Sequence, residues 1–220
     1  MKTLQQIGEE LDRAGLFTGG PVQLFESASR LQISTLLRVG LHPHSKVLDI
    51  GCGALRAGYW LVRVLDADCY FGIEPSREML QAGIQHMLTP QLCEEKRPKF
   101  SNNDQFDFSE FGTSFDVFLA RSVWSHASKA QIATMLDGFI RYGSPTAFFL
   151  TSFLPSGWFK RDYKGAEWKG KSHLSTKGGQ VRHSRKWIED QCKARALKIE
   201  RLSDEPFNGQ YWLKIVRKAA

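Results

Sequence analysis

The sequence predicts an α/β fold in which a mainly parallel sheet is doubly wound with helices and ends in an antiparallel C-terminal hairpin. Three observations predict it. Short apolar runs rich in β-branched and aromatic residues recur along the chain, stretches of helical periodicity separate them, and the last two runs are joined only by a turn. Strands that alternate with helices are typical of a parallel sheet, because parallel neighbours need a crossover connection.

The N-terminal segment has helical patterning before the first strand. Residues 3–14 place apolar side chains on one helical face, the Gly-Gly-Pro run at 19–21 breaks that pattern, and residues 22–39 resume helical spacing. We expect residues 1–40 to form a small helical cap.

Seven strands and four further helices are expected after this cap. The strands are residues 46–50, 69–74, 98–103, 115–120, 146–154, 197–204 and 210–218. The helices are residues 54–65, 76–88, 129–142 and 183–197. A turn over 206–209 should close the final hairpin. Residues 155–182, rich in glycine, lysine and aromatics, interrupt the alternation, and we interpret them as a lid-like insertion in one domain spanning 1–220.

Charge and cysteine usage narrow the partners and the compartment. The net charge of +7 favours an anionic partner, whether phosphate, carboxylate or nucleic acid. The four cysteines form no C-x-x-C pair, so neither a zinc pattern nor a redox motif is present. The N-terminus lacks the apolar core of a signal peptide, and no apolar run has the length of a membrane span. A cytoplasmic protein with no membrane partner is expected.

A glycine turn follows the first strand and indicates a nucleotide site. The stretch from 47 to 58 reads VLDIGCGALRAG. Gly51 and Gly53 fit the start of a dinucleotide turn, but Arg56 occupies the position of its third glycine. Asp49, just before the turn, would repel a pyrophosphate and attract a cationic group. S-adenosylmethionine has such a cationic end and NAD does not.

Two more acidic residues fit the same cofactor. Glu74 ends the second strand, where its carboxylate can accept hydrogen bonds from both ribose hydroxyls and would disfavour a 2′-phosphate. Asp104 follows the expected third strand and is placed to receive an adenine amino group. Singly, each could be an ordinary capping, surface or turn residue, but their joint placement favours the cofactor site.

The motifs VLDIGCG, FGIEPS, NNDQFDF and FDVFLARSVWSH resemble those of the class I S-adenosylmethionine-dependent methyltransferases over about residues 40–152. The resemblance implies a Rossmann-like seven-stranded sheet, and the terminal hairpin is similar to strands six and seven of that family. It implies that the cofactor is contacted by Asp49, Gly51, Cys52, Gly53, Glu74, Pro75, Asp104, Gln105 and Arg121. The family often has Gly where this chain has Leu55, so the loop there is expected to differ.

More narrowly, GCGALRAG, SVWSH and FNGQYWL resemble a bacterial subgroup that acts on sugars and other small hydroxylated acceptors. A hydroxyl acceptor must lose a proton, and His126 is the best candidate base because its ordinary pKa is near working pH. The alternative is that His126 caps a helix or only positions the acceptor. His183, which opens the next helix after the insertion, is the second candidate, and His173 is interpreted as a solvated loop residue.

Several reactions are disfavoured by absent patterns. No Asn/Asp-Pro-Pro-Tyr/Phe motif follows the fourth strand, no cysteine follows a proline, and no Asp/Asn cluster near 116–126 suggests a metal site. Metal-independent O-methyl transfer is therefore the preferred reaction, and N-transfer to a small amine stays open.

A basic segment near the C-terminal third of the chain indicates the kind of acceptor. Residues 160–186 hold nine Lys or Arg against two acids, and aromatic residues lie among them and just before them. This composition suits a cover over a phosphorylated or carboxylated small molecule, which we favour, or a nucleic-acid strand, as in an RNA methyltransferase. An inactive cofactor-binding partner subunit is a further alternative, and an NAD-linked oxidoreductase is disfavoured by Arg56 and Asp49.

Overall fold

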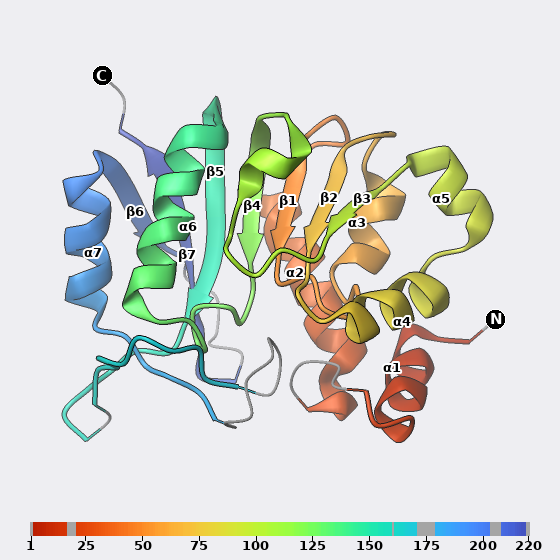
Figure 1. Ribbon diagram of the computed structural model, residues 1–220, viewed down its shortest axis with the longest axis horizontal. Coiled ribbons are helices and arrows are strands. Elements are labelled where there is room, and N and C mark those ends of the chain that lie inside the picture. Colours follow the sequence, from red (N-terminus) through yellow and green to blue (C-terminus); the bar gives the residue numbers. More distant parts are fainter. Residues whose placement is uncertain (1, 17–20, 160, 171–178, 203–207, 219–220) are drawn as a thin grey trace. The chain divides into compact units, whose positions relative to one another are not determined.

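The computed structural model describes residues 2–16, 21–159, 161–170, 179–202 and 208–218. These fall into two compact units, Met1–Asp104 and Gln105–Ala220 (Figure 1). None of the helices that the structure describes is long and apolar enough to cross a bilayer.

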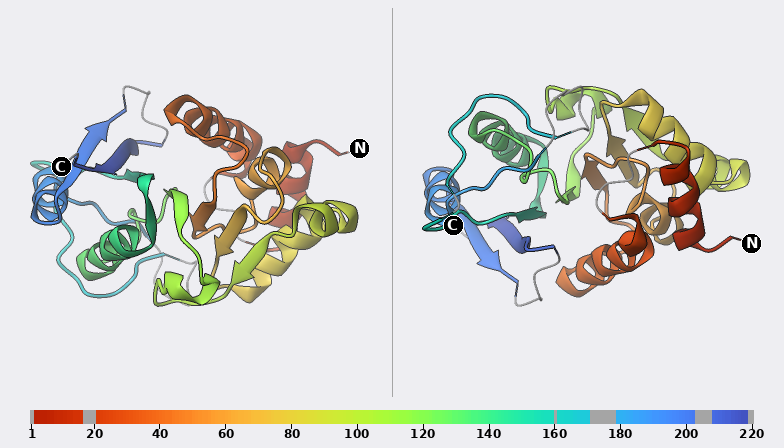
Figure 2. Two further views of the ribbon diagram at one scale, coloured as in Figure 1. Left: turned by 90° about the horizontal axis from the view of Figure 1, so that it is seen from above. Right: turned by 90° about the horizontal axis from the view of Figure 1, so that it is seen from below.

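The first unit contains three parallel strands in the order β3-β2-β1. They are β1 (Val47–Ile50), β2 (Tyr70–Ile73) and β3 (Lys99–Ser101). Every residue of β1 and β2 is buried, as expected of strands covered on both faces. Its helical elements are α1 (Leu4–Arg13), η1 (Val22–Leu24), α2 (Phe25–Val39), α3 (Gly58–Val64), α4 (Arg77–Met87) and α5 (Pro90–Lys96). Among these helices α2 contacts α3, α3 contacts α5, and α1 contacts both α2 and α4 (Figures 1 and 2).

The N-terminal helices have clear end signals. Thr3 forms a capping box with Gln6 at the start of α1, and Gly40 ends α2 in the left-handed conformation. The two helices approach closely at Gly8, where a Cβ would lie 2.5 Å from the Phe25 ring. The helix expected over 22–39 begins as the 3₁₀ turn η1 and continues as α2, and residues 17–20 lie outside the described ranges.

One helix of this unit was not predicted. Helix α5 begins after Thr89, whose side chain accepts a hydrogen bond from Leu92 N, and has Pro90 in its first turn. Threonine followed by proline is a helix-start signal that the sequence does carry. The helix itself has only seven residues, which are too few to show a clear apolar periodicity.

The second unit contains four strands in the order β4-β5-β7-β6. They are β4 (Phe115–Ala120), β5 (Gly143–Phe153), β6 (Leu197–Arg201) and β7 (Tyr211–Arg217). Strands β4 and β5 are parallel, whereas β7 is antiparallel to both β5 and β6. The predicted terminal hairpin is therefore confirmed. Residues 203–207 of its connection, including part of the expected turn, lie outside the described ranges.

The helices of this unit are η2 (Phe108–Phe111), α6 (Lys129–Tyr142) and α7 (Arg185–Ala194). The two long helices lie on one face of the strands (Figure 2). Between them and the strands lies an aromatic core centred on Phe118, whose ring contacts those of Phe108, Phe115, Phe139 and Phe149. These packed rings fix the position of β4, the strand that leads into the SVWSH motif.

The segment between β5 and α7 is mostly irregular but is attached to the rest of its unit. The backbone N–H of Val181 donates to the Ser125 carbonyl oxygen at 2.7 Å, and that of Lys169 donates to the His126 carbonyl oxygen at 2.9 Å. Residue 160 and residues 171–178, which include His173, lie outside the described ranges.

Candidate active site

The glycine turn after β1 has the backbone shape that a nucleotide loop requires. Gly51 and Gly53 have φ of 69° and 57°, in the region that favours glycine. The N–H groups of Gly51 and Cys52 both donate to the Ile73 carbonyl oxygen, at 2.8 and 3.0 Å. Leu55 also has a positive φ, of 59°. The chain thus adopts at Leu55 a left-handed conformation that glycine would adopt without strain.

Two other glycines allow helices to pack closely around this turn. A Cβ at Gly83 of α4 would lie 2.6 Å from the carbonyl carbon of Ala54, so the helix rests directly on the turn. A Cβ at Gly58 would lie 2.8 Å from the hydroxyl oxygen of Tyr70 and 3.0 Å from Leu55. The close approach that a dinucleotide turn obtains from its third glycine is obtained here from these two positions, which sequence reasoning had not assigned.

Glu74 connects the glycine turn to the start of α4. Its Oε2 accepts a hydrogen bond from Gly53 N at 3.1 Å, and its Oε1 accepts one from Ser76 N at 2.9 Å. The side chain of Asn102 donates to the Glu74 backbone oxygen at 2.7 Å. Glu74 is only 3% exposed, and burial raises the pKa of its carboxyl although both backbone donors oppose this.

Asp49 is a second buried carboxylate of the same unit. Burial raises the pKa of its carboxyl to about 7, against a hydrogen bond of 2.8 Å that Oδ2 accepts from the Tyr70 hydroxyl. The negative charge of Glu74 adds to the increase. Arg56 is half-buried, and desolvation lowers its pKa to about 10. Since Asp49 is hydrogen-bonded to Tyr70 and almost fully buried, we expect its charge rather than direct contact to act on a ligand.

The remaining predicted cofactor residues are positioned as follows. Pro75 is buried directly after Glu74, whereas Asp104 and Gln105 are exposed at the bend that follows β3. In this unit two buried carboxylates with raised pKa values accompany an open glycine turn, since only the Met79 sulfur lies within 4 Å of a Cβ built at Gly53. A cationic ligand with a ribose diol fits these acceptor groups, because the ribose hydroxyls can donate hydrogen bonds to a carboxylate and a positive charge offsets the cost of ionising a buried carboxyl.

Arg121, in the second unit, is held by the ends of β5 and β7. Its Nη1 donates to Gln210 Oε1 at 2.5 Å, Ser152 Oγ at 2.8 Å and Ser122 Oγ at 3.0 Å. Its guanidinium carbon lies 5.0 Å from the centre of the Trp212 ring. Sequence reasoning missed Ser152 and Gln210, although a serine inside an apolar strand and the Gln of FNGQYWL were visible signals.

His126 is fixed by the segment between β5 and α7. Its Nδ1 lies 2.5 Å from the Lys169 carbonyl oxygen, and since a carbonyl only accepts, Nδ1 carries a proton. The ring also hydrogen-bonds the Gly179 backbone and stacks on Trp168 at 5.7 Å between centroids. Gly170 is required here, because a Cβ at that position would overlap the His126 ring. Burial lowers the pKa of His126 below its usual 6.5, although both backbone hydrogen bonds oppose this.

His183, the second candidate base, occupies a different environment. It is fully buried, and its Nε2 lies 3.0 Å from the Ala127 carbonyl oxygen. Its own backbone N–H donates to the Leu154 carbonyl oxygen at 3.0 Å. This placement favours a structural role over contact with an acceptor. Over the described ranges, no group of three or more His, Cys, Asp or Glu could hold a metal ion.

Comparisons with known proteins agree with this fold and turn. Residues 48–149 match the family model described as a methyltransferase domain. Magnesium protoporphyrin IX methyltransferase from Synechocystis PCC 6803, crystallised with bound SAM, superposes with a TM-score of 0.67 at 15% identity over 99% of each chain. The structure of the DhpI–SAH complex superposes with a TM-score of 0.64 at 16% identity, over 97% of this chain and 95% of the DhpI chain. The methyltransferase domain of bacterial CtHen1-C superposes with a TM-score of 0.62 at 13% identity, over 89% of this chain and 100% of that domain.

No curated protein matches the sequence significantly. The structural similarity nevertheless confirms the predicted class: a Rossmann-like α/β protein with a mainly parallel sheet of seven strands and an antiparallel C-terminal hairpin. Residues 48–149 therefore match a methyltransferase domain, in agreement with the resemblance of the sequence motifs to the class I S-adenosylmethionine-dependent methyltransferases. The predicted cofactor, S-adenosylmethionine, agrees with this domain match and with the SAM and SAH bound in the similar structures.

The raised pKa of Asp49 predicts a pH-dependent affinity for S-adenosylmethionine. The free protein protonates Asp49 near pH 7, and a bound cation should favour the ionised form. The dissociation constant should therefore fall as pH rises from 6 to 8, by at most about tenfold per pH unit, since one proton is released. Calorimetry in buffers of different ionisation enthalpy measures both the affinity and the released proton.

The same group has the opposite effect on the unliganded protein. A carboxyl whose folded pKa exceeds its unfolded value of 3.8 stabilises the fold fully below that value, and this contribution is lost as pH rises through about 7. Asp49→Asn should abolish both the pH dependence of affinity and this loss of stability. A pH dependence that persists in the variant would assign it to another group.

Proposed function

We propose that the protein transfers the methyl group of S-adenosylmethionine to a hydroxyl oxygen of a small anionic acceptor, without a metal ion, with His126 as general base. The observation that carries this proposal is the environment of His126. Its ring is held by the backbone of Lys169 and Gly179, and its pKa lies below 6.5, so that it is neutral at pH 7.

The two units would have different roles in this reaction. When bound, S-adenosylmethionine supplies an electrophilic methyl group on a sulfonium. Glu74 would accept hydrogen bonds from the ribose hydroxyls, and Asp49 would supply negative charge near the positive end. Gly51, Cys52, Gly53, Pro75, Asp104, Gln105 and Arg121 are proposed to complete the cofactor contacts. His126 would orient the acceptor hydroxyl and take its proton at Nε2 as the oxygen is methylated, because Nδ1 already carries a proton and donates to the Lys169 carbonyl oxygen.

We prefer oxygen over nitrogen as the methylated atom. One similar structure supports this preference and another does not. One of them is an O-methyltransferase family protein from Burkholderia thailandensis, with a TM-score of 0.60 at 12% identity. Another is a ribosomal protein L11 methylase, so the shared fold leaves the acceptor open. A cytoplasmic location belongs to the same proposal, and its support is that all four cysteines are free thiols.

A second candidate function, RNA methylation, is favoured by two exposed aromatic side chains. Trp158 and Phe159 are 97% and 94% exposed, and Arg161 and Lys164 follow them closely in the chain. Aromatic faces beside cations suit the stacking of unpaired bases. Binding of a single-stranded oligonucleotide with a steep salt dependence would support this function, because each neutralised phosphate releases counterions.

The first experiment is calorimetric titration with S-adenosylhomocysteine, with NAD as the control. We expect S-adenosylhomocysteine to bind with a micromolar dissociation constant and NAD not to bind. A screen of hydroxylated anions with S-adenosylmethionine should then yield a methylated product. Cofactor binding with no transfer to any acceptor, even with protein partners added, would instead favour an inactive cofactor-binding subunit.

A further inference from the structure

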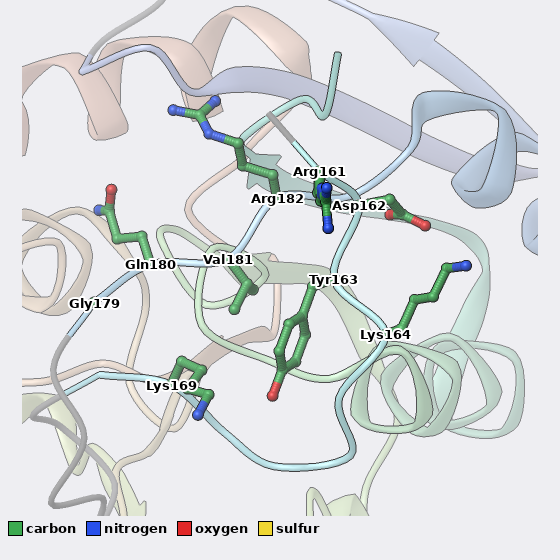
Figure 3. A pocket seen from close by; sticks show the side chains of 9 residues that line it. All are labelled: Arg161, Asp162, Tyr163, Lys164, Lys169, Gly179, Gln180, Val181 and Arg182. Carbon is green, nitrogen blue, oxygen red and sulfur yellow. The ribbon is translucent and has the colours of Figure 1, made fainter. Parts of the chain in front are cut away.

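A pocket beside His126 has several cationic side chains in its lining and little negative charge. Its volume is about 340 Å³, and it lies within the second unit. Its lining residues are Arg161, Asp162, Tyr163, Lys164, Lys169, Gly179, Gln180, Val181 and Arg182. Figure 3 shows Arg161 and Arg182 at one end, Lys169 at the other, and the Tyr163 ring between them. Four of these nine residues carry a positive charge, and a single one is acidic.

The acidic residue does not neutralise this pocket. Asp162 Oδ2 lies 2.5 Å from Lys129 Nζ, a residue outside the lining, and Oδ1 accepts a hydrogen bond from Ser184 N at 2.8 Å. The hydrogen bond from Lys129 helps to keep the pKa of Asp162 low although burial opposes it. Both oxygens of the carboxylate are therefore engaged by neighbours, and the positive charge of the lining is left largely uncompensated by it.

The pocket is built on a defined backbone. Tyr163 N donates to the Arg182 carbonyl oxygen at 2.8 Å, which joins its two walls, and Val181 N donates to Ser125. Arg182 Nη1 donates to the Pro155 carbonyl oxygen at 3.1 Å, and the Tyr163 hydroxyl donates to Glu167 O at 2.8 Å. The lining is thus fastened to the turn that carries His126.

Two lining residues also contact the His126 ring. Lys169 accepts a hydrogen bond from Nδ1 through its carbonyl oxygen, and Gly179 bonds the ring through its backbone. Lys169 and Gly179 therefore lie between the pocket and the His126 ring, each touching both. An acceptor could place its charged group in the pocket while its hydroxyl lies at the histidine.

We propose that this pocket binds the phosphate group of a small phosphorylated acceptor. A phosphomonoester carries about −1.5 to −2 charges at pH 7 and three strong acceptor oxygens, which suits several cations better than a carboxylate does. The volume is at the lower end of small-molecule sites, about 300–1,000 Å³, and favours a single small ligand. This inference deepens the proposed function and depends on it for the role of the bound molecule.

The test compares two doubly substituted proteins of equal net charge. Arg161→Gln with Lys164→Gln removes two cations of the pocket, and Lys193→Gln with Lys198→Gln removes two exposed cations elsewhere in the same unit. Binding of ribose 5-phosphate, ribose and inorganic phosphate is measured by calorimetry on the full chain saturated with S-adenosylhomocysteine. The pocket variant should lose about 30-fold in affinity for ribose 5-phosphate, since each charge-assisted contact contributes severalfold or more. The control should change less than about twofold.

Each other outcome has a defined meaning. Equal losses in both variants, or absence of saturable phosphate binding to the parent at millimolar concentration, would overturn the inference while leaving the methyltransferase function intact. Tighter binding of a single-stranded oligonucleotide than of ribose 5-phosphate, with a steep salt dependence, would also overturn it in favour of RNA. Failure of the parent to bind S-adenosylhomocysteine would instead count against the proposed function. Unchanged cofactor affinity and thermal unfolding in both variants establish that each is folded.

Discussion

Glu74→Gln is expected to weaken S-adenosylhomocysteine binding by about 100-fold, which corresponds to about 2.7 kcal/mol. Hydrogen bonds to a charged group contribute about 1.5–3 kcal/mol, and the ribose would donate two of them. The glutamine also retains only one acceptor oxygen. In the present structure both carboxylate oxygens are used, by Gly53 N and Ser76 N, so the substitution must leave one backbone donor unsatisfied or turn the amide away.

The matched control for this substitution is Glu78→Gln. Glu78 is an exposed carboxylate in the first turn of α4, so its removal changes the charge of the same helix end equally. We expect less than about a twofold change in affinity for this variant. Calorimetry gives the two dissociation constants, and thermal unfolding shows whether either protein is destabilised. Comparable affinities of the Glu74 variant and the parent would contradict a ribose-binding role.

The central parts of the fold could be predicted from local patterns. The ranges 115–120 and 129–142 were predicted to the residue, because an apolar run and a Ser128 capping box mark their ends. Strand β5 begins earlier than predicted, at Gly143, since its first four residues are not buried and carry no apolar signal. The short elements α5 and η2 were missed, because they are set by capping and packing rather than by an apolar period.

The cofactor half of the candidate site was predictable for a different reason from the acceptor half. The glycine turn and Glu74 lie at the ends of consecutive strands, so their proximity follows from parallel pairing alone. Contacts between distant segments have no such signature. Ser152 and Gln210 around Arg121, and Lys169 against His126, are brought together only by the folded chain. Gly83 was equally invisible, because its close approach to Ala54 depends on how α4 packs.

His126→Asn is the second decisive substitution, and it separates base catalysis from positioning. The asparagine amide can still donate to the Lys169 carbonyl oxygen as Nδ1 does now, but it cannot accept a proton at working pH. If His126 is the base, kcat should fall by about 10²–10⁴-fold, the usual contribution of general base catalysis. The affinity for S-adenosylhomocysteine should be unchanged. His86→Asn, which alters an exposed histidine of α4, is the control and should retain full activity.

The pH dependence provides the readout that a merely positioning residue would not affect. Because burial lowers the pKa of His126, the acidic limb of kcat/KM should fall below pH 6.5, where the ring becomes protonated and can no longer accept a proton. This limb should disappear in His126→Asn. NMR titration of the imidazole in the parent should give the same pKa, and this measurement needs no acceptor. A variant that keeps the limb, or loses less than about fivefold in kcat, would assign His126 to positioning, since a hydroxyl acceptor without its base cannot be methylated at the parent rate.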